Sequence, residues 1–156
     1  MDQALIRTLA QRLAASGLTA GTAESCTGGR VAAALTSVAG SSVYFQGGVV
    51  AYSNQLKVEL LGVPMEVILE SGAVSEECAR AMATGVRRKL GVDLAVVTTG
   101  IAGPDGGSVD KPVGLVWLAT ANGREVKAVK KLFSGDREAV TRAAADEALA
   151  LLLAAI

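Results

Sequence analysis

The residues best suited to chemistry lie together between Glu24 and Gly29, in the segment ESCTGG. Ser25 and Cys26 are two potential nucleophiles, and an acidic residue precedes them directly. The glycines come just before a helical pattern that starts near Arg30, and the first N–H groups of a helix favour an anionic ligand. The same stretch also fits an ordinary strand–loop–helix connection in which a serine or threonine caps the helix.

The absence of histidine restricts the chemistry that this segment can support. It removes any Ser-His-Asp or Cys-His catalytic set within the chain, so the base for a nucleophile must be lysine, tyrosine, a carboxylate or water. The two cysteines, Cys26 and Cys78, form neither a CxxC pair nor a zinc-ligand spacing. Glu24 and Asp105 could hold a hard ion, but hydrolysis by a serine would not require one. We expect no metal and no cofactor.

Length and composition exclude several classes of protein. The 156 residues fit one domain, spanning residues 1–156, and 51% hydrophobic with 19% charged residues argues against disorder. Zero net charge and 3% aromatic residues argue against a nucleic-acid partner. The longest apolar run, Ala148 to Ile156, is much shorter than the roughly 20 residues of a membrane span. Charged residues interrupt the N-terminal apolar positions, unlike in a secretory signal. We expect a cytoplasmic protein with reduced thiols.

Hydrophobic periodicity predicts strands that alternate with helices. This order, with one terminal hairpin joined by Asn122-Gly123, implies a three-layer α/β/α sandwich with a mainly parallel sheet of about five strands. One strand of the hairpin should be antiparallel to the rest. The expected helices are 2–16, 29–37, 54–61, 64–70, 75–90 and 136 to the end; the expected strands are 18–23, 43–52, 92–98, 113–121 and 125–133.

Three loops leave the carboxyl ends of the expected parallel strands, where open sheets of this kind bind their ligands. They are residues 24–29, 52–57 and 99–107. None matches a standard nucleotide motif: GPDGG lacks the GK[ST] of a P-loop, no GxGxxG follows a strand, and Ser25 lacks the flanking glycines of a nucleophile elbow. The residues alone therefore indicate an α/β domain with a small-molecule site.

Five segments, taken together and in order, carry a resemblance to a known family. They are TAESCTGG, GSSVYFQGGVVAYSNQLK, GAVS at 72–75, GIAGPDGG and KPVGLVW, and they cover about residues 22–136. The chain resembles the C-terminal domain of the competence/damage-inducible CinA family, which includes stand-alone nicotinamide mononucleotide deamidases. Longer members carry an additional N-terminal domain, and this chain resembles the single-domain form.

The resemblance implies an activity and its residues. The activity is hydrolysis of the nicotinamide mononucleotide carboxamide to nicotinic acid mononucleotide and ammonia. The family's nucleophilic serine corresponds to Ser25, and its tyrosine and lysine correspond to Tyr52 and Lys57 in YSNQLK. Between them the family more often has an acidic residue and alanine, whereas this chain has Gln55 and Leu56.

A physical argument supports the same three residues. Burial lowers the pKa of a lysine toward neutrality, so Lys57 could remove the proton of Ser25. The hydroxyl of Tyr52 could lie between them and relay that proton. The alternatives are that Tyr52 packs at a strand end and that Lys57 is a solvated helix residue. Cys26 is the competing nucleophile, although a lone cysteine more often behaves as a small buried hydrophobe.

The remaining site residues would stabilise or bind the substrate. A tetrahedral intermediate needs hydrogen-bond donors for its oxygen, and the candidates are backbone N–H groups of two loops. A plain turn would explain the glycines of the second loop nearly as well. Glu24 is a candidate for orienting the site or the amide, and Arg137 for meeting the phosphate. The candidate oxyanion donors are Cys26, Thr27 and Gly28 in the first loop, and Thr99, Gly100, Ile101 and Ala102 in the second.

Two other classes of function stay open, a non-catalytic nucleotide-binding or regulatory module and a purely structural subunit. The last helix is rich in alanine and leucine and carries no charge after Glu147, so it needs cover on more than one side. A second copy of the chain would provide that cover, and we expect a homo-oligomer. The competing explanation is that the N-terminal helix folds over it.

Overall fold

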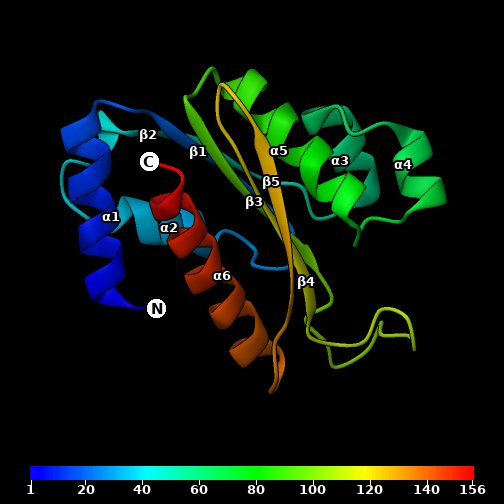
Figure 1. The fold of residues 1–156 in the computed structure, drawn as a ribbon. Coiled ribbons are helices and arrows are strands. Elements are labelled where there is room, and N and C mark those ends of the chain that lie inside the picture. The colour runs from blue at the N-terminus through cyan, green and yellow to red at the C-terminus, as the bar shows by residue number, and fades with distance from the viewer.

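The computed structural model describes residues 1–156. Helices and strands alternate along most of the chain, as the periodicity predicts (Figure 1). The helices are α1 (Gln3–Ser16), α2 (Arg30–Thr36), α3 (Asn54–Leu61), α4 (Met65–Glu70), α5 (Glu76–Leu90) and α6 (Arg137–Ala154), with a 3-10 turn η1 (Ser41–Val43); the strands are β1 (Ala20–Glu24), β2 (Phe45–Val50), β3 (Leu94–Gly100), β4 (Leu115–Ala121) and β5 (Val126–Leu132).

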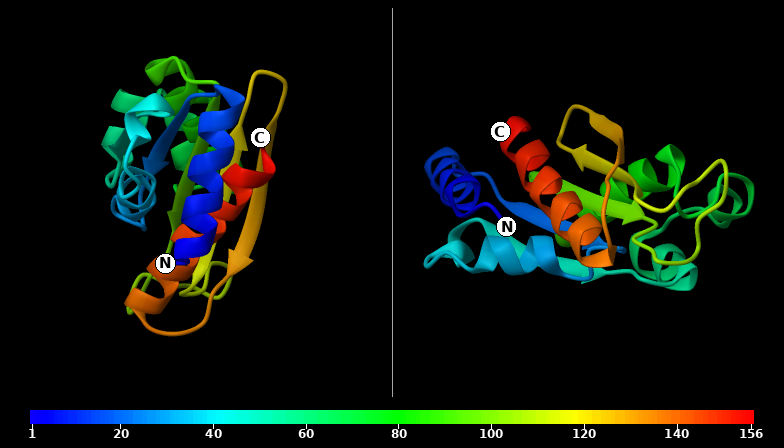
Figure 2. Two further views of the ribbon diagram at one scale, coloured as in Figure 1. Left: turned by 90° about the vertical axis from the view of Figure 1, so that its left-hand side faces the viewer. Right: turned by 90° about the horizontal axis from the view of Figure 1, so that it is seen from below.

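The five strands form one mixed sheet in the order β2-β1-β3-β4-β5. Strands β2, β1 and β3 are parallel, β4 is antiparallel to β3, and β5 is antiparallel to β4. Helices α1, α2 and α6 lie on one face of the sheet, and α3, α4 and α5 lie on the other (Figures 1 and 2). The predicted three-layer α/β/α sandwich with one strand running against the rest is confirmed.

Two hydrophobic cores fill the spaces between the layers. The larger includes Leu9 and Leu13 of α1 and Leu149 of α6, and the smaller includes Met82 and Val86 of α5. The buried faces of β1 and β3 supply residues to both cores, because alternate side chains of a strand point to opposite faces. The central strands are therefore held from both sides.

Capping residues set the helix starts that matter for the site. The side chains of Asp2, Ser53, Ser75 and Asp136 each accept a hydrogen bond from a backbone N–H group of the helix that follows. Ser53 caps α3 and Ser75 caps α5, as the preference of serine for the N-cap position leads one to expect. The N-cap of α2, in contrast, is Gly29, so neither Ser25 nor Thr27 caps that helix.

Most strand ends differ from the sequence prediction by one or two residues, and two of the differences have a clear structural cause. The expected strand 43–52 is shorter at its start, because residues 41–43 form a 3-10 turn, and it ends at Val50; within it, the register against β1 shifts next to Gly47. The hairpin between β4 and β5 exists, but its loop covers residues 122–125. The side chain of Asn122 accepts from the N–H groups of Arg124 and Glu125, so the asparagine organises a longer turn than an Asn-Gly pair alone would form.

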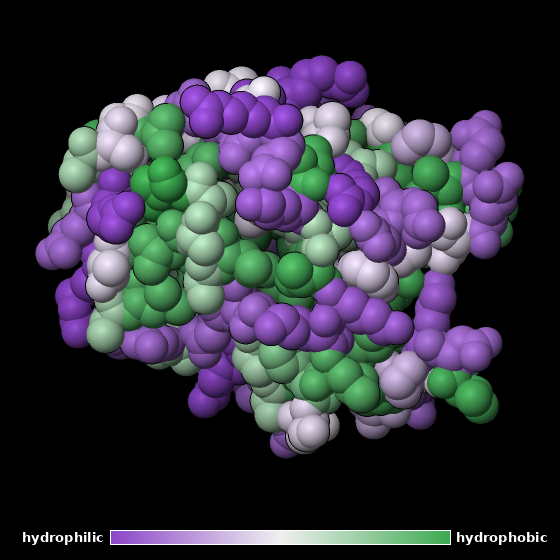
Figure 3. Space-filling view, viewed as in Figure 1, coloured by the Kyte–Doolittle hydropathy of each residue, from purple (hydrophilic) through white to green (hydrophobic).

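The apolar last helix is covered partly from within the chain. Helix α1 lies against α6, and Leu151 and Leu153 of α6 are partly buried against the larger core. Figure 3 shows apolar side chains gathered over this region. The sheet, α1 and α2 all contact α6, so the chain itself covers this helix on more than one side, as the competing explanation expects. The homo-oligomer stays a prediction, and light scattering that gives the mass of one chain would contradict it. None of the helices combines the length and the apolar character needed to cross a bilayer.

Candidate active site

Ser25 and Lys57 meet at the carboxyl-terminal edge of the sheet. Ser25 follows the last residue of β1, and Lys57 lies in α3, which begins four residues after β2 ends. The Nζ atom of Lys57 is 3.1 Å from Oγ of Ser25, and both side chains are buried, with Lys57 only 1% exposed. The fold thus brings a serine hydroxyl and a lysine amine together from positions 32 residues apart.

The position of α3 depends on a close approach to α5. A Cβ atom on Gly85 would lie 1.7 Å from the carbonyl oxygen of Leu61, so only glycine allows these helices to pack as they do. At the other end of α3, the hydroxyl of Ser53 accepts from the N–H of Leu56. The cap and the close contact together fix the helix that carries Lys57.

The surroundings of Lys57 suit a neutral amine. Besides Ser25, its Nζ donates to the carbonyl oxygens of Ala51 at 2.9 Å and Tyr52 at 3.1 Å. These carbonyls can only accept, so a neutral amine can give both its N–H groups to them and use its lone pair to accept from the serine hydroxyl. Lys57 forms no ion pair with a carboxylate. Desolvation by burial lowers the pKa of Lys57 below its usual value.

Tyr52 lies at the rim of the site. Its backbone oxygen accepts from Lys57, but its side chain is 58% exposed and its hydroxyl accepts from Nη2 of Arg137 at 2.9 Å. The hydroxyl therefore does not lie between Ser25 and Lys57, which contact each other directly. The sequence-based idea of a tyrosine relay between them does not match this arrangement.

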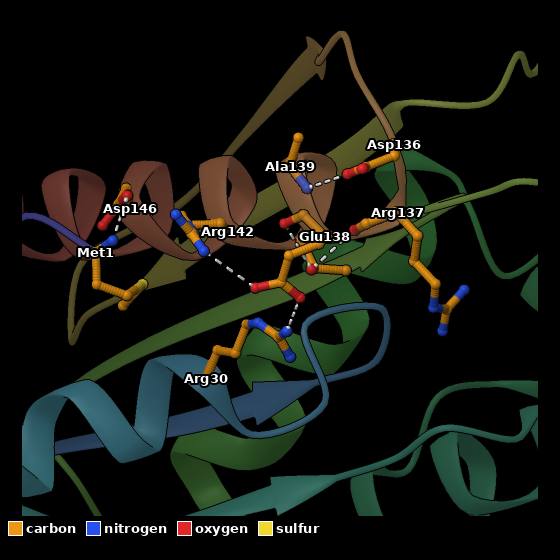
Figure 4. Close-up of polar contacts among 9 residues, drawn as sticks. Met1, Arg30, Asp136, Arg137, Glu138, Ala139, Arg142 and Asp146 are labelled. Carbon is orange, nitrogen blue, oxygen red and sulfur yellow. Dashed lines mark hydrogen bonds and ion pairs between the residues drawn. The ribbon is translucent and has the colours of Figure 1, made fainter.

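Arg137 connects the start of α6 to two other segments. Its Nη1 donates to the carbonyl oxygen of Gly103 at 2.9 Å, in the loop after β3, while its Nη2 reaches Tyr52. Figure 4 shows this guanidinium directed away from Glu138, which pairs instead with Arg30 and Arg142. Arg137 has no carboxylate partner, so its charge remains available to an anionic ligand.

A pocket of about 270 Å³ opens beside these residues. It contains Ser25, Cys26, Tyr52, Lys57, Arg137 and the predicted residues Thr99, Gly100, Ile101 and Ala102. The sequence suggested one of the other lining residues, Asp105, only as an oxygen ligand for a hard ion, and it suggested no direct ligand contact for the rest. Within YSNQLK the resemblance indicated Tyr52 and Lys57 but not Asn54, and nothing in GAVS indicated that Ala73 and Val74 would line the pocket. The other lining residues are Asn54, Ala73, Val74, Gly103, Asp105 and Gly106.

Donors for a negatively charged oxygen are present in this pocket. The backbone N–H groups of Cys26 and Ala102 donate to no backbone acceptor of another residue. The N–H of Ile101, in contrast, donates to the carbonyl oxygen of Leu115 at 2.8 Å, so it is not free for a ligand. Among the backbone donors proposed from sequence, Cys26 and Ala102 therefore line the pocket and have N–H groups without a partner in another backbone group.

The thiol of Cys26 is less suited to nucleophilic attack than the hydroxyl beside it. Burial raises the pKa of Cys26 to about 11, so the thiolate is scarce near neutral pH. Cys78 is fully buried, and burial raises its pKa to about 11 as well. The contact with Lys57 belongs to Ser25, which favours the serine.

Three residues that the sequence placed in the site do not line the pocket. Glu24, Thr27 and Gly28 belong to the turn behind Ser25, and the carboxylate of Glu24 is occupied by hydrogen bonds within that turn and α2. Gly28 and Gly29 have φ angles of 60° and 100°, which other residues rarely adopt. The start of α2 is consequently filled by Glu24 and does not receive a ligand anion. No group of three or more cysteine, aspartate or glutamate side chains is placed to bind a metal.

Comparison with known proteins identifies the family. The model of the CinA C-terminal domain matches residues 2–156. A putative competence-damage inducible protein of Desulforudis audaxviator is 55% identical over 139 residues, which are 89% of this chain and 34% of that protein. A CinA-like protein of Geobacter sulfurreducens is 51% identical over 150 residues, 95% of this chain and 36% of that protein. The chain thus spans about a third of the length of these curated relatives.

Solved structures of similar length share the fold. The competence/damage inducible protein CihA from Agrobacterium tumefaciens superposes with a TM-score of 0.95 at 42% identity, covering 97% of this chain and 93% of that one. A CinA superfamily protein from Klebsiella pneumoniae gives a TM-score of 0.94 at 38% identity, covering 99% and 98%. With the family model matching nearly every residue, the chain belongs to the CinA C-terminal domain family.

Proposed function

We propose that this chain hydrolyses the carboxamide of nicotinamide mononucleotide, releasing ammonia and nicotinic acid mononucleotide. Ser25 is the nucleophile and Lys57 is the base in this proposal. The observation that carries it is the contact of 3.1 Å between Lys57 Nζ and Ser25 Oγ, in a buried setting that lowers the pKa of the lysine. A serine hydroxyl needs such a neighbour, and the chain has no histidine to provide it.

The first half of the reaction forms an ester. Lys57, as a neutral amine, takes the proton of Ser25 while Oγ attacks the carboxamide carbon. The N–H groups of Cys26 and Ala102 are the donors available to the resulting oxyanion. When the C–N bond breaks, the ammonium of Lys57 returns its proton to the leaving nitrogen, and ammonia departs from an acyl-serine.

The second half reverses these roles. Water attacks the acyl carbon while Lys57 removes a proton from the water. The bond between the acyl carbon and Ser25 Oγ then breaks. Lys57 gives its proton to the serine oxygen, so the free hydroxyl and the acid product are formed. Because the same amine serves as base and acid in turn, no second titrating side chain is needed.

The choice of substrate rests on the family motifs, and the pocket is compatible with it. Arg137 supplies a positive charge that no carboxylate of the chain neutralises, and Asp105 supplies an acceptor on the same pocket. In the proposal Arg137 meets the phosphate, because a guanidinium matches its geometry. The start of α2 takes no part in phosphate binding, since Glu24 already occupies its N–H groups.

The direct test is incubation of the purified protein with nicotinamide mononucleotide, followed by ammonia assay and product chromatography. The proposal expects equimolar ammonia and nicotinic acid mononucleotide, and neither product from the Ser25→Ala variant. Tight binding of the nucleotide with no ammonia release would instead support a nucleotide-binding module. Release of free nicotinamide would indicate cleavage of the glycosidic bond and would contradict the proposal.

A further inference from the structure

We propose that Glu24 is a positioning residue that holds Ser25 in reach of Lys57, although its own carboxylate never contacts the substrate. The inference rests on the proposed role of Ser25 as a nucleophile. It concerns a buried acid that the reaction described above does not use. Its side chain is 1% exposed and does not line the pocket, so it cannot act on a ligand directly.

The carboxylate of Glu24 accepts four hydrogen bonds. Its Oε2 accepts from Thr27 Oγ1 at 2.6 Å, from the N–H of Gly29 at 3.0 Å and from the N–H of Val31 at 3.1 Å. Its Oε1 accepts from the N–H of Ala32 at 2.8 Å. The last residue of β1 is thus tied to the first turn of α2, where backbone donors would otherwise be unpaired.

The hydroxyl groups around Glu24 have a defined direction. A carboxylate can only accept, so the Thr27 hydroxyl must donate to Glu24. The contact of 2.7 Å between Thr27 Oγ1 and Thr98 Oγ1 is therefore donated by Thr98. These hydrogen bonds run from Thr98 of β3 through Thr27 in the turn to Glu24 of β1. They link the two strands whose ends carry the pocket.

Ser25 lies inside this network. Its N–H donates to the carbonyl oxygen of Thr98 at 3.0 Å, and its own carbonyl oxygen accepts from the N–H of Gly28 at 3.1 Å. Because the N–H and the carbonyl group of Ser25 are both hydrogen-bonded, the turn fixes the direction of the Ser25 side chain. Misplacing a reacting atom by about 1 Å can cost about 100-fold in rate, so a loosened turn should reduce attack more than binding.

The network can be broken from the threonine side with a matched set of variants. Thr27→Val keeps the shape but removes the hydroxyl between Glu24 and Thr98, whereas Thr27→Ser keeps that hydroxyl. Thr22→Val is the control, because Thr22 is a buried threonine of β1 whose hydroxyl has no hydrogen-bond partner. Glu24→Gln places an amide against the backbone donors of α2. Circular dichroism and the melting temperature confirm that each protein is folded.

The measured quantity is the rate at which an alkyl fluorophosphonate labels Ser25. In this reaction Oγ forms a bond to phosphorus, fluoride leaves and Lys57 takes the proton. We expect about 10-fold slower labelling for Thr27→Val and about 10- to 100-fold slower labelling for Glu24→Gln, with Thr27→Ser and Thr22→Val near wild type. With nicotinamide mononucleotide, kcat should fall by similar factors and KM should change little.

The labelling test is independent of the substrate. If wild-type protein labels at Ser25 but releases no ammonia from nicotinamide mononucleotide, the substrate assignment fails and the ranking of the variants still tests the inference. Folded Thr27→Val or Glu24→Gln protein that labels at the wild-type rate would overturn it. Thr27→Ser as slow as Thr27→Val would also overturn it, because the hydroxyl would then not be the connecting group.

Discussion

The floor and the rim of the pocket use hydrogen bonds of similar length in opposite environments. On the floor, Lys57 Nζ contacts Ser25 Oγ at 3.1 Å and is almost fully buried. On the rim, Arg137 Nη2 contacts the hydroxyl of Tyr52 at 2.9 Å, and the tyrosine is 58% exposed. The two hydrogen bonds therefore differ little in length, but they differ strongly in how far their side chains are buried.

Burial changes what each basic group can do. Lys57 on the floor is buried away from water and has no carboxylate beside it. Burial therefore lowers the pKa of Lys57, and the neutral amine can act as a base. A guanidinium stays charged in any setting, so Arg137 can only bind or orient. Water also weakens the rim contact, because exposed charges are screened. The comparison predicts chemical roles for the floor and binding roles for the rim.

Removing the hydroxyl of Ser25, the proposed nucleophile, should have the largest effect. Ser25→Ala should lower kcat by about 10⁴-fold or more, because the acyl-serine cannot form. The fold should persist, since the hydroxyl is not a helix cap in this structure. Ammonia release and the melting temperature are the two measurements. Full activity in Ser25→Ala together with loss in Cys26→Ala would move the nucleophile to the neighbouring thiol.

Changing the floor amine should come next. Lys57→Arg replaces the amine by a guanidinium that stays protonated and cannot act as a neutral base, so kcat should fall by about 10³-fold. Steady-state ammonia release measures it, and Lys89→Arg is a control because Lys89 lies in the last turn of α5, outside the pocket. Near-normal turnover by Lys57→Arg would remove the lysine from the chemistry.

The rim cation should affect binding. Arg137→Ala should raise KM by about 10-fold or more and change kcat less, because a charge-assisted hydrogen bond to the phosphate is lost. The same variant should lose little toward nicotinamide riboside, which has no phosphate. Initial rates with both compounds test the difference. Equal losses for the two substrates would show that Arg137 supports the pocket without binding phosphate.

The smallest effect is expected at the rim tyrosine. Tyr52→Phe removes the hydroxyl that accepts from Arg137 but keeps the backbone oxygen that accepts from Lys57. A change of about 2- to 5-fold in KM is expected, as for the loss of one exposed hydrogen bond. A loss of kcat in Tyr52→Phe comparable to that in Lys57→Arg would instead support a proton relay through the Tyr52 hydroxyl. The comparison between floor and rim would then fail.

Much of the fold could be predicted because its signals are local. The serine before α5, the glycines after α1 and α5, and the apolar run of β3 each indicate an element from a few neighbouring residues. The three-layer arrangement then follows from their order. The long turn at Asn122 was less predictable, because the side chain of one residue replaces the backbone pairing expected for the hairpin.

The site was predictable as a set of residues and less so as a set of contacts. The sequence motifs indicated Ser25, Tyr52 and Lys57, and all three line one pocket. The inward direction of Glu24 depends on N–H groups of α2, whose positions no sequence pattern reveals. The pairing of Tyr52 with Arg137 joins residues 85 positions apart, so only the folded chain shows it.

The most direct measurement of the central claim is the pH dependence of Ser25 reactivity, recorded beside an NMR titration of the Lys57 amine. The folded state holds the pKa of Lys57 below its usual value, so the fraction of neutral amine rises as the pH rises through that lowered value. Labelling of Ser25 should therefore be slow at low pH, increase about 10-fold per pH unit and level off above the same pKa that NMR reports. A labelling rate that does not depend on pH, or that follows a pKa different from that of Lys57, would contradict the account.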